Sequence, residues 1–191
     1  MWEEAINIQD YLLIRKIIKG DEEAFDSLVK KHYNNIYHYC FRKTGNKEIA
    51  KDLTQEVFMK LIRSIHRYRF TGKFTNFLFT IAVNTCNDFY RYYYRQKKDV
   101  YPRGDFNDQV DERANPQEHF MQEELATRVK HALDTLPSFQ KDALILYYYH
   151  DLKVKDIAEI MDANLSTTKS RLKQGRDKLE EMFREDDFFE K

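Results

Sequence analysis

Residues 156–172 read DIAEIMDANLSTTKSRL, a stretch that predicts two short helices joined by a tight turn at Asp162-Ala163-Asn164. Ala158 is small where the first helix must approach the second. Asn164 can cap the second helix, because its side-chain oxygen can accept a hydrogen bond from a backbone N–H of the first turn. The pattern is typical of a helix-turn-helix.

The second helix of this motif has an apolar side and a polar side. Leu165, Leu172 and Leu179 recur at heptad spacing, so we expect them to face the core. Short hydroxyl side chains near the start of such a helix can reach phosphates or base edges in the major groove, and lysine and arginine can contact phosphate or guanine. Charge alone would equally fit a solvated helix face. The residues expected to point outward are Ser166, Thr167, Lys169, Ser170, Lys173 and Arg176.

The rest of the chain is expected to be helical as well, which makes the fold all-α. Its 191 residues include five glycines, three prolines and no alternating Val/Ile/Thr-rich stretch bounded by turn residues, so a β-sheet is not predicted. Asp21 is a good N-cap for the second helix. Thr44-Gly45-Asn46 is expected to stop that helix and to cap the next. The other expected helices are Tyr11 to Ile18, Ile49 to Ile65, Phe74 to Gln96, Leu125 to Leu136, Phe139 to Tyr149, Val154 to Met161 and Leu165 to Phe183.

The formal net charge of zero hides a separation of charge along the chain. Between Lys60 and Lys98 nine basic residues face one acidic residue, whereas between Asp105 and Glu124 seven acidic residues face one basic residue. A basic segment of this kind suits a nucleic-acid surface.

The polar stretch between the two halves, with Pro102, Gly104 and Pro116, predicts a flexible linker. We therefore expect two small helical domains, residues 1–98 and 120–191, joined by a linker at residues 99–119.

Neither a metal site nor a disulfide framework is indicated. Cys40 and Cys86 lie far apart and have no CxxC or Cys/His ligand spacing around them, so they are expected to be small hydrophobic residues. The N-terminus opens with acidic residues and has no apolar run long enough for a signal peptide or membrane span. A soluble cytoplasmic protein without a cofactor is the expectation.

The C-terminal half resembles region 4 of bacterial sigma factors. Two positions depart from the family's usual pattern, because Asp162 stands where glycine is usual in the turn and Thr168 where valine is usual. The resemblance implies that the helix after the turn reads the minus-thirty-five promoter element through Ser166, Thr167, Lys169, Ser170, Arg171, Lys173 and Arg176. It is carried by LDTLP at 133–137, Gln140, Leu144, Leu146, Tyr147, DIAE at 156–159 and TTKSRL at 167–172.

Residues 50–58, AKDLTQEVF, resemble sigma region 2.2. The resemblance implies that Asp52, Gln55 and Glu56 bind the coiled coil of the polymerase beta-prime clamp. A rigid helix with a polar outer face and buried aliphatic residues suits docking onto a partner helix, although an ordinary surface helix has the same composition.

Residues 74–82, FTNFLFTIA, resemble sigma regions 2.3 and 2.4, with Phe77 at a position that is usually tryptophan. These regions contact the minus-ten element and help to open it. Stacking on an aromatic side chain is worth roughly 1–3 kcal/mol per base, comparable with the few kcal/mol that extruding a base costs. Phe74, Phe77, Leu78 and Ile81 have helical spacing and are expected to be core. The minus-ten candidates are Tyr68, Arg69, Phe70, Lys73, Asn76, Asn84, Arg91 and Arg95.

The two-domain pattern, without room for a sigma-3 domain, is similar to the extracytoplasmic-function (ECF) subfamily. It implies a non-enzymatic protein that binds core RNA polymerase at the beta-prime clamp coiled coil and the beta flap, contacts promoter DNA and is held by an anti-sigma factor. An autonomous helix-turn-helix regulator would need only the C-terminal half and would bind its operator without polymerase. A helical enzyme using His32, His38 or paired carboxylates is the other alternative, but the six histidines are scattered and the sequence contains no HExxH motif or phosphate loop.

Overall fold

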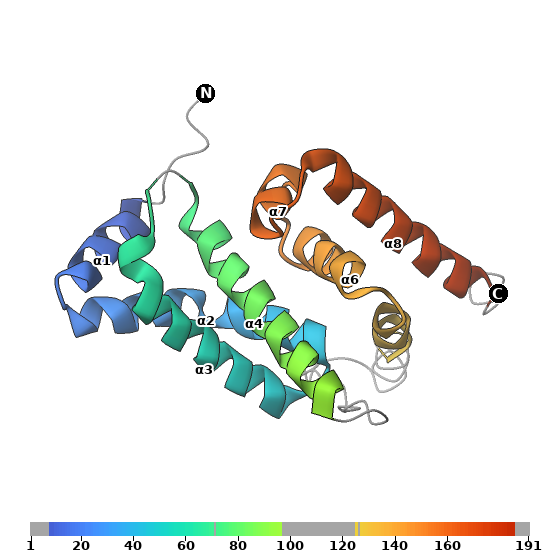
Figure 1. Ribbon diagram of the computed structural model, residues 1–191, viewed down its shortest axis with the longest axis horizontal. Coiled ribbons are helices and arrows are strands. Elements are labelled where there is room, and N and C mark those ends of the chain that lie inside the picture. Colours follow the sequence, from blue (N-terminus) through green and yellow to red (C-terminus); the bar gives the residue numbers. More distant parts are fainter. Residues whose placement is uncertain (1–7, 71, 97–124, 126, 186–191) are drawn as a thin grey trace, which may run out of the picture.

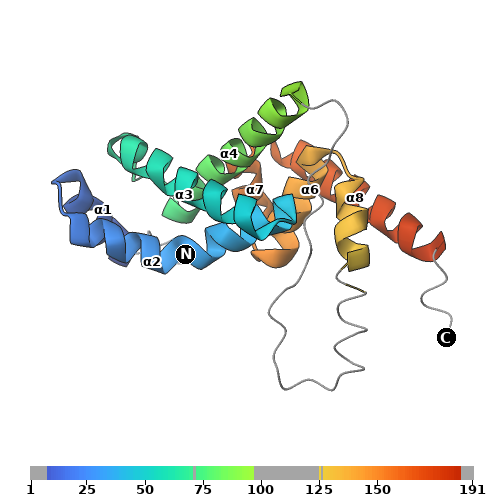
Figure 2. The same cartoon turned by 90° about the horizontal axis from the view of Figure 1, so that it is seen from below.

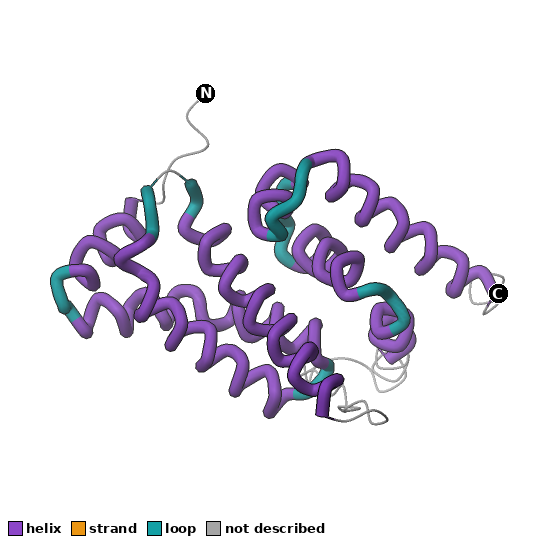
Figure 3. The backbone as a smooth tube through the Cα atoms, viewed as in Figure 1, coloured by secondary structure: helices purple, strands orange, loops and turns teal. Residues whose placement is uncertain are grey.

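Helices connected by short turns make up the described chain, and no strand lies among them (Figure 1, Figure 3). The computed structural model describes residues 8–70, 72–96, 125 and 127–185. The expected all-α class is therefore confirmed for this part of the chain. The linker predicted at residues 99–119 lies outside the described residues.

The N-terminal domain begins with two helices in tandem. Gly20 ends the first with φ 91°, and Asp21 caps the second by accepting a hydrogen bond from the Ala24 N–H at 2.9 Å, as the sequence predicted. Gly45 ends that second helix with φ 66°, and Asn46 caps the next through the Ile49 N–H at 3.0 Å. The elements are α1 (Ile8–Ile18), α2 (Glu22–Thr44), α3 (Lys47–Ser64), the 3₁₀ turn η1 (Ile65–Arg67) and α4 (Phe74–Gln96).

The C-terminal domain starts with helical residues 127–134, so Leu136 lies beyond the end of the helix that was expected to include it. The helix expected from Phe139 to Tyr149 is α-helical only in its first half and continues as a π-helical turn. Tyr147, Tyr148 and Tyr149 of this turn are exposed. The elements are α6 (Ser138–Leu144), the π-helical turn η2 (Ile145–Tyr149), α7 (Val154–Ile160) and α8 (Leu165–Glu185).

The two helices α7 and α8 form the predicted helix-turn-helix. Asn164 caps α8 as expected, because its Oδ1 accepts the Thr167 N–H at 2.7 Å. The unusual Thr168 is fully buried, and its hydroxyl donates to the Asn164 carbonyl at 3.0 Å, so the hydroxyl is satisfied within its own helix. The unusual Asp162 has φ 45°, in the left-handed region that favours glycine.

One of the three heptad leucines does not face the core. Leu172 and Leu179 are partly buried and pack against core residues, but 46% of Leu165 is exposed. The prediction for Leu165 was wrong because the residue occupies the first position of α8, where no preceding turn of the helix brings it against a neighbour.

The two domains pack against each other through a continuous apolar core. Figure 2 shows the helices of both domains from below. Ile145, Leu146 and Ile157 are fully buried and belong to the same cluster as Tyr39 of α2 and Leu78 of α4. A smaller cluster of Leu133, Leu136 and Leu144 lies within the C-terminal domain. The helix-turn-helix therefore depends on the N-terminal domain for part of its buried surface.

The positive φ of Asp162 leads to a stability prediction. Replacing Asp162 by valine should destabilise the chain by about 1–2 kcal/mol, because a β-branched side chain is strained in the left-handed region. Asp162→Gly should be neutral or stabilising by up to about 1 kcal/mol, since relief of strain is offset by the greater freedom of glycine in the unfolded chain. Urea unfolding followed by circular dichroism measures both. Equal stability of the valine and glycine variants would contradict the left-handed conformation.

Candidate nucleic-acid interface

The outer face of α3 carries the residues predicted to bind polymerase. Asp52, Gln55 and Glu56 are exposed, and Glu56 forms an ion pair with Lys60 at 2.8 Å. The opposite side of α3 is buried against α2 and α4, so the helix is held rigidly. In Figure 1, α3 lies on the side of α4 away from α6 and α8.

Two apolar residues continue this face and were not singled out in the sequence. Met59 and Ile62 follow Asp52 and Gln55 by one heptad, and they are 52% and 42% exposed. The two side chains form an exposed apolar strip next to the polar residues of α3. The heptad spacing could have identified them, because residues seven apart lie on the same side of a helix.

The aromatic side chains of the loop before α4 pack against one another instead of lying fully exposed on the surface. Tyr68 is 9% exposed, and its hydroxyl donates to the Gly72 carbonyl at 2.7 Å. Its ring lies 5.0 Å from that of Phe70 and 5.3 Å from that of Phe77. The structure thus places the minus-ten candidate Tyr68 in the core, while Phe70 is half-buried and Arg69 is exposed.

The expectation that the α4 aromatics are core is confirmed. Phe74 and Leu78 are buried, and Phe77 and Ile81 are partly buried against the same cluster. The tyrosines at the end of α4 are less covered: Tyr92 is 63% exposed and Tyr94 is 51% exposed.

Lys73 and Asn76, two other minus-ten candidates, contact the helix-turn-helix. The Lys73 ammonium lies 2.8 Å from Oδ2 of Asp156. The Asn76 amide donates to Oδ1 of Asp156 at 3.0 Å and to Oε2 of Glu159 at 2.8 Å. Burial alone would raise the pKa of Asp156, but the hydrogen bonds from Lys73 and Asn76 outweigh it and hold the pKa below its ordinary value.

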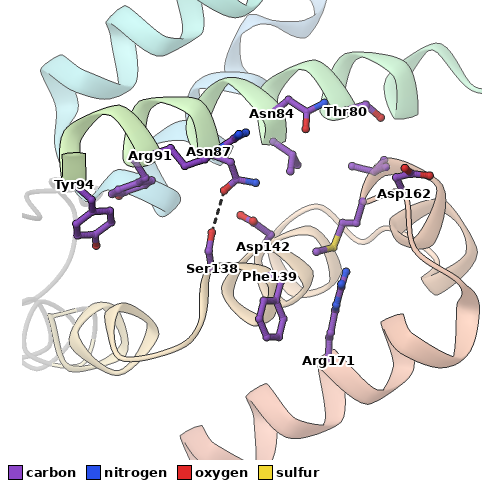
Figure 4. A pocket seen from close by; sticks show the side chains of 14 residues that line it. Thr80, Asn84, Asn87, Arg91, Tyr94, Ser138, Phe139, Asp142, Asp162 and Arg171 are labelled. Carbon is purple, nitrogen blue, oxygen red and sulfur yellow. Dashed lines mark hydrogen bonds between the residues drawn. The ribbon is translucent and has the colours of Figure 1, made fainter. Parts of the chain in front are cut away.

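Two of the three remaining α4 candidates face a cleft between the domains. Asn84 and Arg91 line this cleft of about 540 Å³ opposite α6, α7 and α8, as Figure 4 shows. Arg91 also pairs with Asp88 at 2.6 Å. Arg95 is exposed near the end of α4.

The front of α8 presents most of the minus-thirty-five candidates to solvent. One of them differs: Arg171 is partly buried, lies across the Phe139 ring at 5.2 Å and faces the interdomain cleft. Thr167 is partly buried at the capped first turn. The exposed candidates are Ser166, Lys169, Ser170, Lys173 and Arg176.

A buried polar cluster joins the domains and was missed by sequence reasoning. The Lys43 ammonium of α2 pairs with the Asp142 carboxylate of α6 at 2.5 Å, and both side chains are almost completely buried. Tyr39 donates to Asp142 at 2.8 Å, and burial together with this negative charge raises the pKa of Tyr39 well above its ordinary value. Lys43 also donates to the Ser138 hydroxyl at 2.7 Å. No local pattern signals such partners, because the residues are distant in sequence.

Comparisons with known proteins agree with this geometry. The family model of sigma-70 region 2 matches residues 28–96, and that of sigma-70 region 4 matches residues 126–179. The ECF RNA polymerase sigma-E factor of Haemophilus influenzae is 30% identical over 185 residues, which is 92% of this chain and 96% of the relative. The chain belongs to the ECF family of RNA polymerase sigma factors. Sigma factors of this family bind RNA polymerase for promoter-specific transcription initiation and are regulators of transcription rather than enzymes.

A further relative and two solved structures match most of this chain and most of their own length. The ECF sigma factor SigW of Bacillus subtilis is 27% identical over 181 residues, covering 90% of this chain and 95% of the relative. Two solved structures share the fold, each with a TM-score of 0.68. CnrH, in complex with the cytosolic domain of CnrY, is 18% identical and covers 93% of this chain and 99% of that chain. RpoE of Bartonella quintana, in complex with the anti-sigma factor NepR, is 21% identical and covers 84% and 96%.

The described residues contain no group of three His, Cys, Asp or Glu side chains that could hold a metal ion. No helix in this part of the chain is long and apolar enough to cross a membrane. Cys40 and Cys86 are both fully buried, with their sulfur atoms 3.8 Å apart.

His150 is a largely buried titratable group at the domain interface. Its ring lies 4.8 Å from Phe79 of the other domain, and burial, together with the positive charges of His38 and Arg42, lowers its pKa from 6.5 to about 4. A histidine whose pKa is lower in the folded state favours folding fully above pH 6.5, and this contribution is lost as the pH falls toward 4.

We therefore expect wild-type protein to lose about 1–2 kcal/mol of unfolding free energy through His150 between pH 7 and pH 5. His150→Phe should reduce the loss by that amount, because phenylalanine fits beside Phe79 and does not titrate. Urea unfolding at the two pH values gives the difference. An unchanged pH dependence in the variant would show that His150 is not held neutral.

Proposed function

We propose that this sigma factor performs its role through three surfaces on separate helices. The outer face of α3 docks onto the beta-prime clamp coiled coil, the start of α4 contacts the minus-ten element, and the front of α8 reads the minus-thirty-five element. The chain supplies contacts and no reaction chemistry, and it acts in the cytoplasm, where core polymerase and promoter DNA are present.

The exposure and rigidity of α3 support its role in docking. Asp52, Gln55 and Glu56 present two carboxylates and an amide to solvent, while the other side of the helix is buried. A partner helix with basic residues would find complementary charge on a preorganised surface, which increases both the association rate and the specificity. Met59 and Ile62 add apolar area next to these groups.

The geometry of α8 supports its role in reading duplex DNA. Its first turn is capped, and hydroxyl side chains at its start are followed by lysine and arginine on the solvent side. A helix that enters the major groove contacts base edges with its N-terminal residues and phosphates with flanking cations. Arg171 would have to leave Phe139 before it could contact DNA.

The two DNA surfaces belong to different domains, for which we propose the boundaries 1–98 and 120–191 with a linker at 99–119. A linker raises the effective concentration of the second surface once the first is bound. Each surface alone would bind weakly, and core polymerase would set the distance between them. The beta flap is the proposed contact of the C-terminal domain. An anti-sigma factor is a further proposed partner, because RpoE of Bartonella quintana, which shares the fold, forms a complex with the anti-sigma factor NepR.

The single observation that carries the docking surface is the exposed polar face of α3. Asp52→Ala, Gln55→Ala and Glu56→Ala combined should weaken binding to core polymerase at least about tenfold and reduce run-off transcription from genomic promoters to a similar extent. The matched control replaces Glu23, Asp26 and Asn34, two carboxylates and an amide that are exposed on α2, by alanine. Equal core binding by the two triple variants would refute the docking role. Absence of any promoter-specific transcript from the wild type with core would refute the proposed function.

For the minus-thirty-five surface, Lys173 is the residue to test for a phosphate contact. Its ammonium is exposed and lies 3.5 Å from Asp177, a weak surface pair. Lys173→Gln should weaken holoenzyme binding similarly at all promoters and lower the slope of log affinity against log salt concentration by about 1. Gel-shift titrations at several salt concentrations measure the slope. Loss of affinity at one promoter sequence only would indicate a base contact.

A further inference from the structure

The two cysteines of the chain meet in the core, although they are 46 residues apart in sequence. Cys40 lies on α2 and Cys86 on α4, and both side chains are 0% exposed. The Cys86 thiol donates to the Cys40 sulfur across 3.8 Å. Because a disulfide bond is about 2.0 Å long, the sulfur atoms need to approach each other by a further ~1.8 Å to form one. The fold therefore brings together a pair that sequence spacing did not reveal.

Two adjacent thiols can be oxidised together by a peroxide. One thiol attacks the peroxide, becomes a sulfenic acid and gives its proton to the departing hydroxide or alkoxide. The second thiol then attacks the sulfenic sulfur, so that the S–S bond forms and the sulfenic oxygen leaves as water with the second thiol proton. We propose that Cys40 and Cys86 are a peroxide-responsive site at which this two-electron oxidation joins α2 to α4.

Burial makes this reaction slow and its product lasting. The thiolate is the reactive form of cysteine, and the hydrogen bond to Cys40, together with burial, raises the pKa of Cys86 well above its ordinary value. The pair therefore stays reduced during brief contact with a peroxide. The same burial shields the disulfide from thiols in solution, because an attacking thiolate must also reach the sulfur atoms.

A cavity beside the pair gives a peroxide its access path. The cavity has a volume of about 180 Å³, and Lys43 of α2 and Tyr90 of α4 are among its lining residues. Since a water molecule occupies about 30 Å³ in the liquid, a peroxide fits. Each of the two lining residues follows a cysteine by one helical turn, and the Tyr90 hydroxyl donates to the Lys43 carbonyl at 2.9 Å. Tyr90 thus borders the cavity and the thiol pair, and we expect its ring to slow access.

The disulfide would close a loop that contains all of α3 and η1. The proposed polymerase-docking face lies within this loop, but neither cysteine belongs to a proposed binding surface. A cross-link restricts the unfolded chain more than the folded one, so it stabilises the N-terminal domain and leaves its outer faces uncovered. Oxidised protein is therefore expected to resist unfolding.

The first test exposes the folded full chain to hydrogen peroxide and labels the remaining thiols with N-ethylmaleimide after denaturation. Met59 is 52% exposed, and its conversion to the sulfoxide shows in the same sample that the peroxide has acted. Once Met59 is converted, most wild-type chains should carry no maleimide and should yield a peptide pair linked through Cys40 and Cys86 in mass spectrometry. Cys40→Ala and Cys86→Ala are the matched controls and should yield no such pair.

A variant of α4 tests the access path. Tyr90→Ala should speed the loss of thiols at least about threefold, because it removes the ring that borders the cavity and the pair. The matched control is Tyr92→Ala, which removes a ring that is 63% exposed and is not among the lining residues of this cavity. The control should be oxidised at the rate of the wild type.

Thermal unfolding measures the consequence of the bond. The oxidised wild type should unfold at a temperature at least about 5 °C above that of the reduced protein. Reduction with dithiothreitol in denaturant followed by refolding should abolish this gain, although it leaves methionine sulfoxide unchanged. Neither single-cysteine variant should show the gain.

Free thiols in the wild type after full conversion of Met59, or sulfinic and sulfonic acids in place of the disulfide, would overturn the inference. Equal rates of thiol loss in Tyr90→Ala, Tyr92→Ala and the wild type would overturn the access path. If Tyr90→Ala does not fold, the wild type and the single-cysteine variants decide alone. None of these measurements involves polymerase or DNA, so their result is independent of the proposed function.

Discussion

The ion pair between Lys43 and Asp142 is the interaction on which the arrangement of the two domains depends. Its two charges are 2% and 1% exposed, and Tyr39 and Ser138 supply the surrounding hydrogen bonds. Removing one partner of a buried pair leaves an uncompensated charge, which typically costs about 3–5 kcal/mol. Lys141 strengthens the junction by donating to the Lys43 carbonyl at 2.7 Å.

This junction joins α6 to α2, and next to it the C-terminal domain docks on α4. Ile145 and Leu146 of η2 and Ile157 of α7 belong to the same apolar core as residues of α2 and α4. The same docking turns α7 toward the start of α4 and directs Arg171 into the cleft, while the outer faces of α3 and α8 point away from the interface. This docking leaves the outer face of α3 exposed and brings α7 against the start of α4.

Local patterns predicted the elements well because caps and helix periodicity act over a few residues. Asp21 and Asn164 cap helices as expected, and α4 runs from Phe74 to Gln96 as expected. The π-helical turn after Leu144 was not predicted, since helix periodicity does not distinguish it from an α-helix; its Ile145 and Leu146 lie in the core shared with the other domain. The spacing of the helix-turn-helix residues fits both a sigma factor and an autonomous regulator. The family resemblance of both halves of the chain identified the sigma factor class.

The environment of individual site residues was harder to predict. Asn76 and Arg171 are polar residues on helices, and their sequence context resembles that of any exposed side chain. In the fold, Asn76 contacts Glu159, which is distant along the chain, and Arg171 contacts Phe139, which lies on a different helix. Tyr68 was expected at the surface, but aromatic neighbours within its own domain bury it.

The distance between the outer faces of α3 and α8 in solution tests most directly whether the two domains pack against each other in the free chain. Spin labels at Lys51→Cys and Glu181→Cys lie on exposed positions, whereas the native Cys40 and Cys86 are buried. Double electron–electron resonance should give one narrow distance distribution for the free chain and a longer distance after core polymerase and promoter DNA are added. A broad distribution in the free chain, or the same narrow distribution in the complex, would contradict the account.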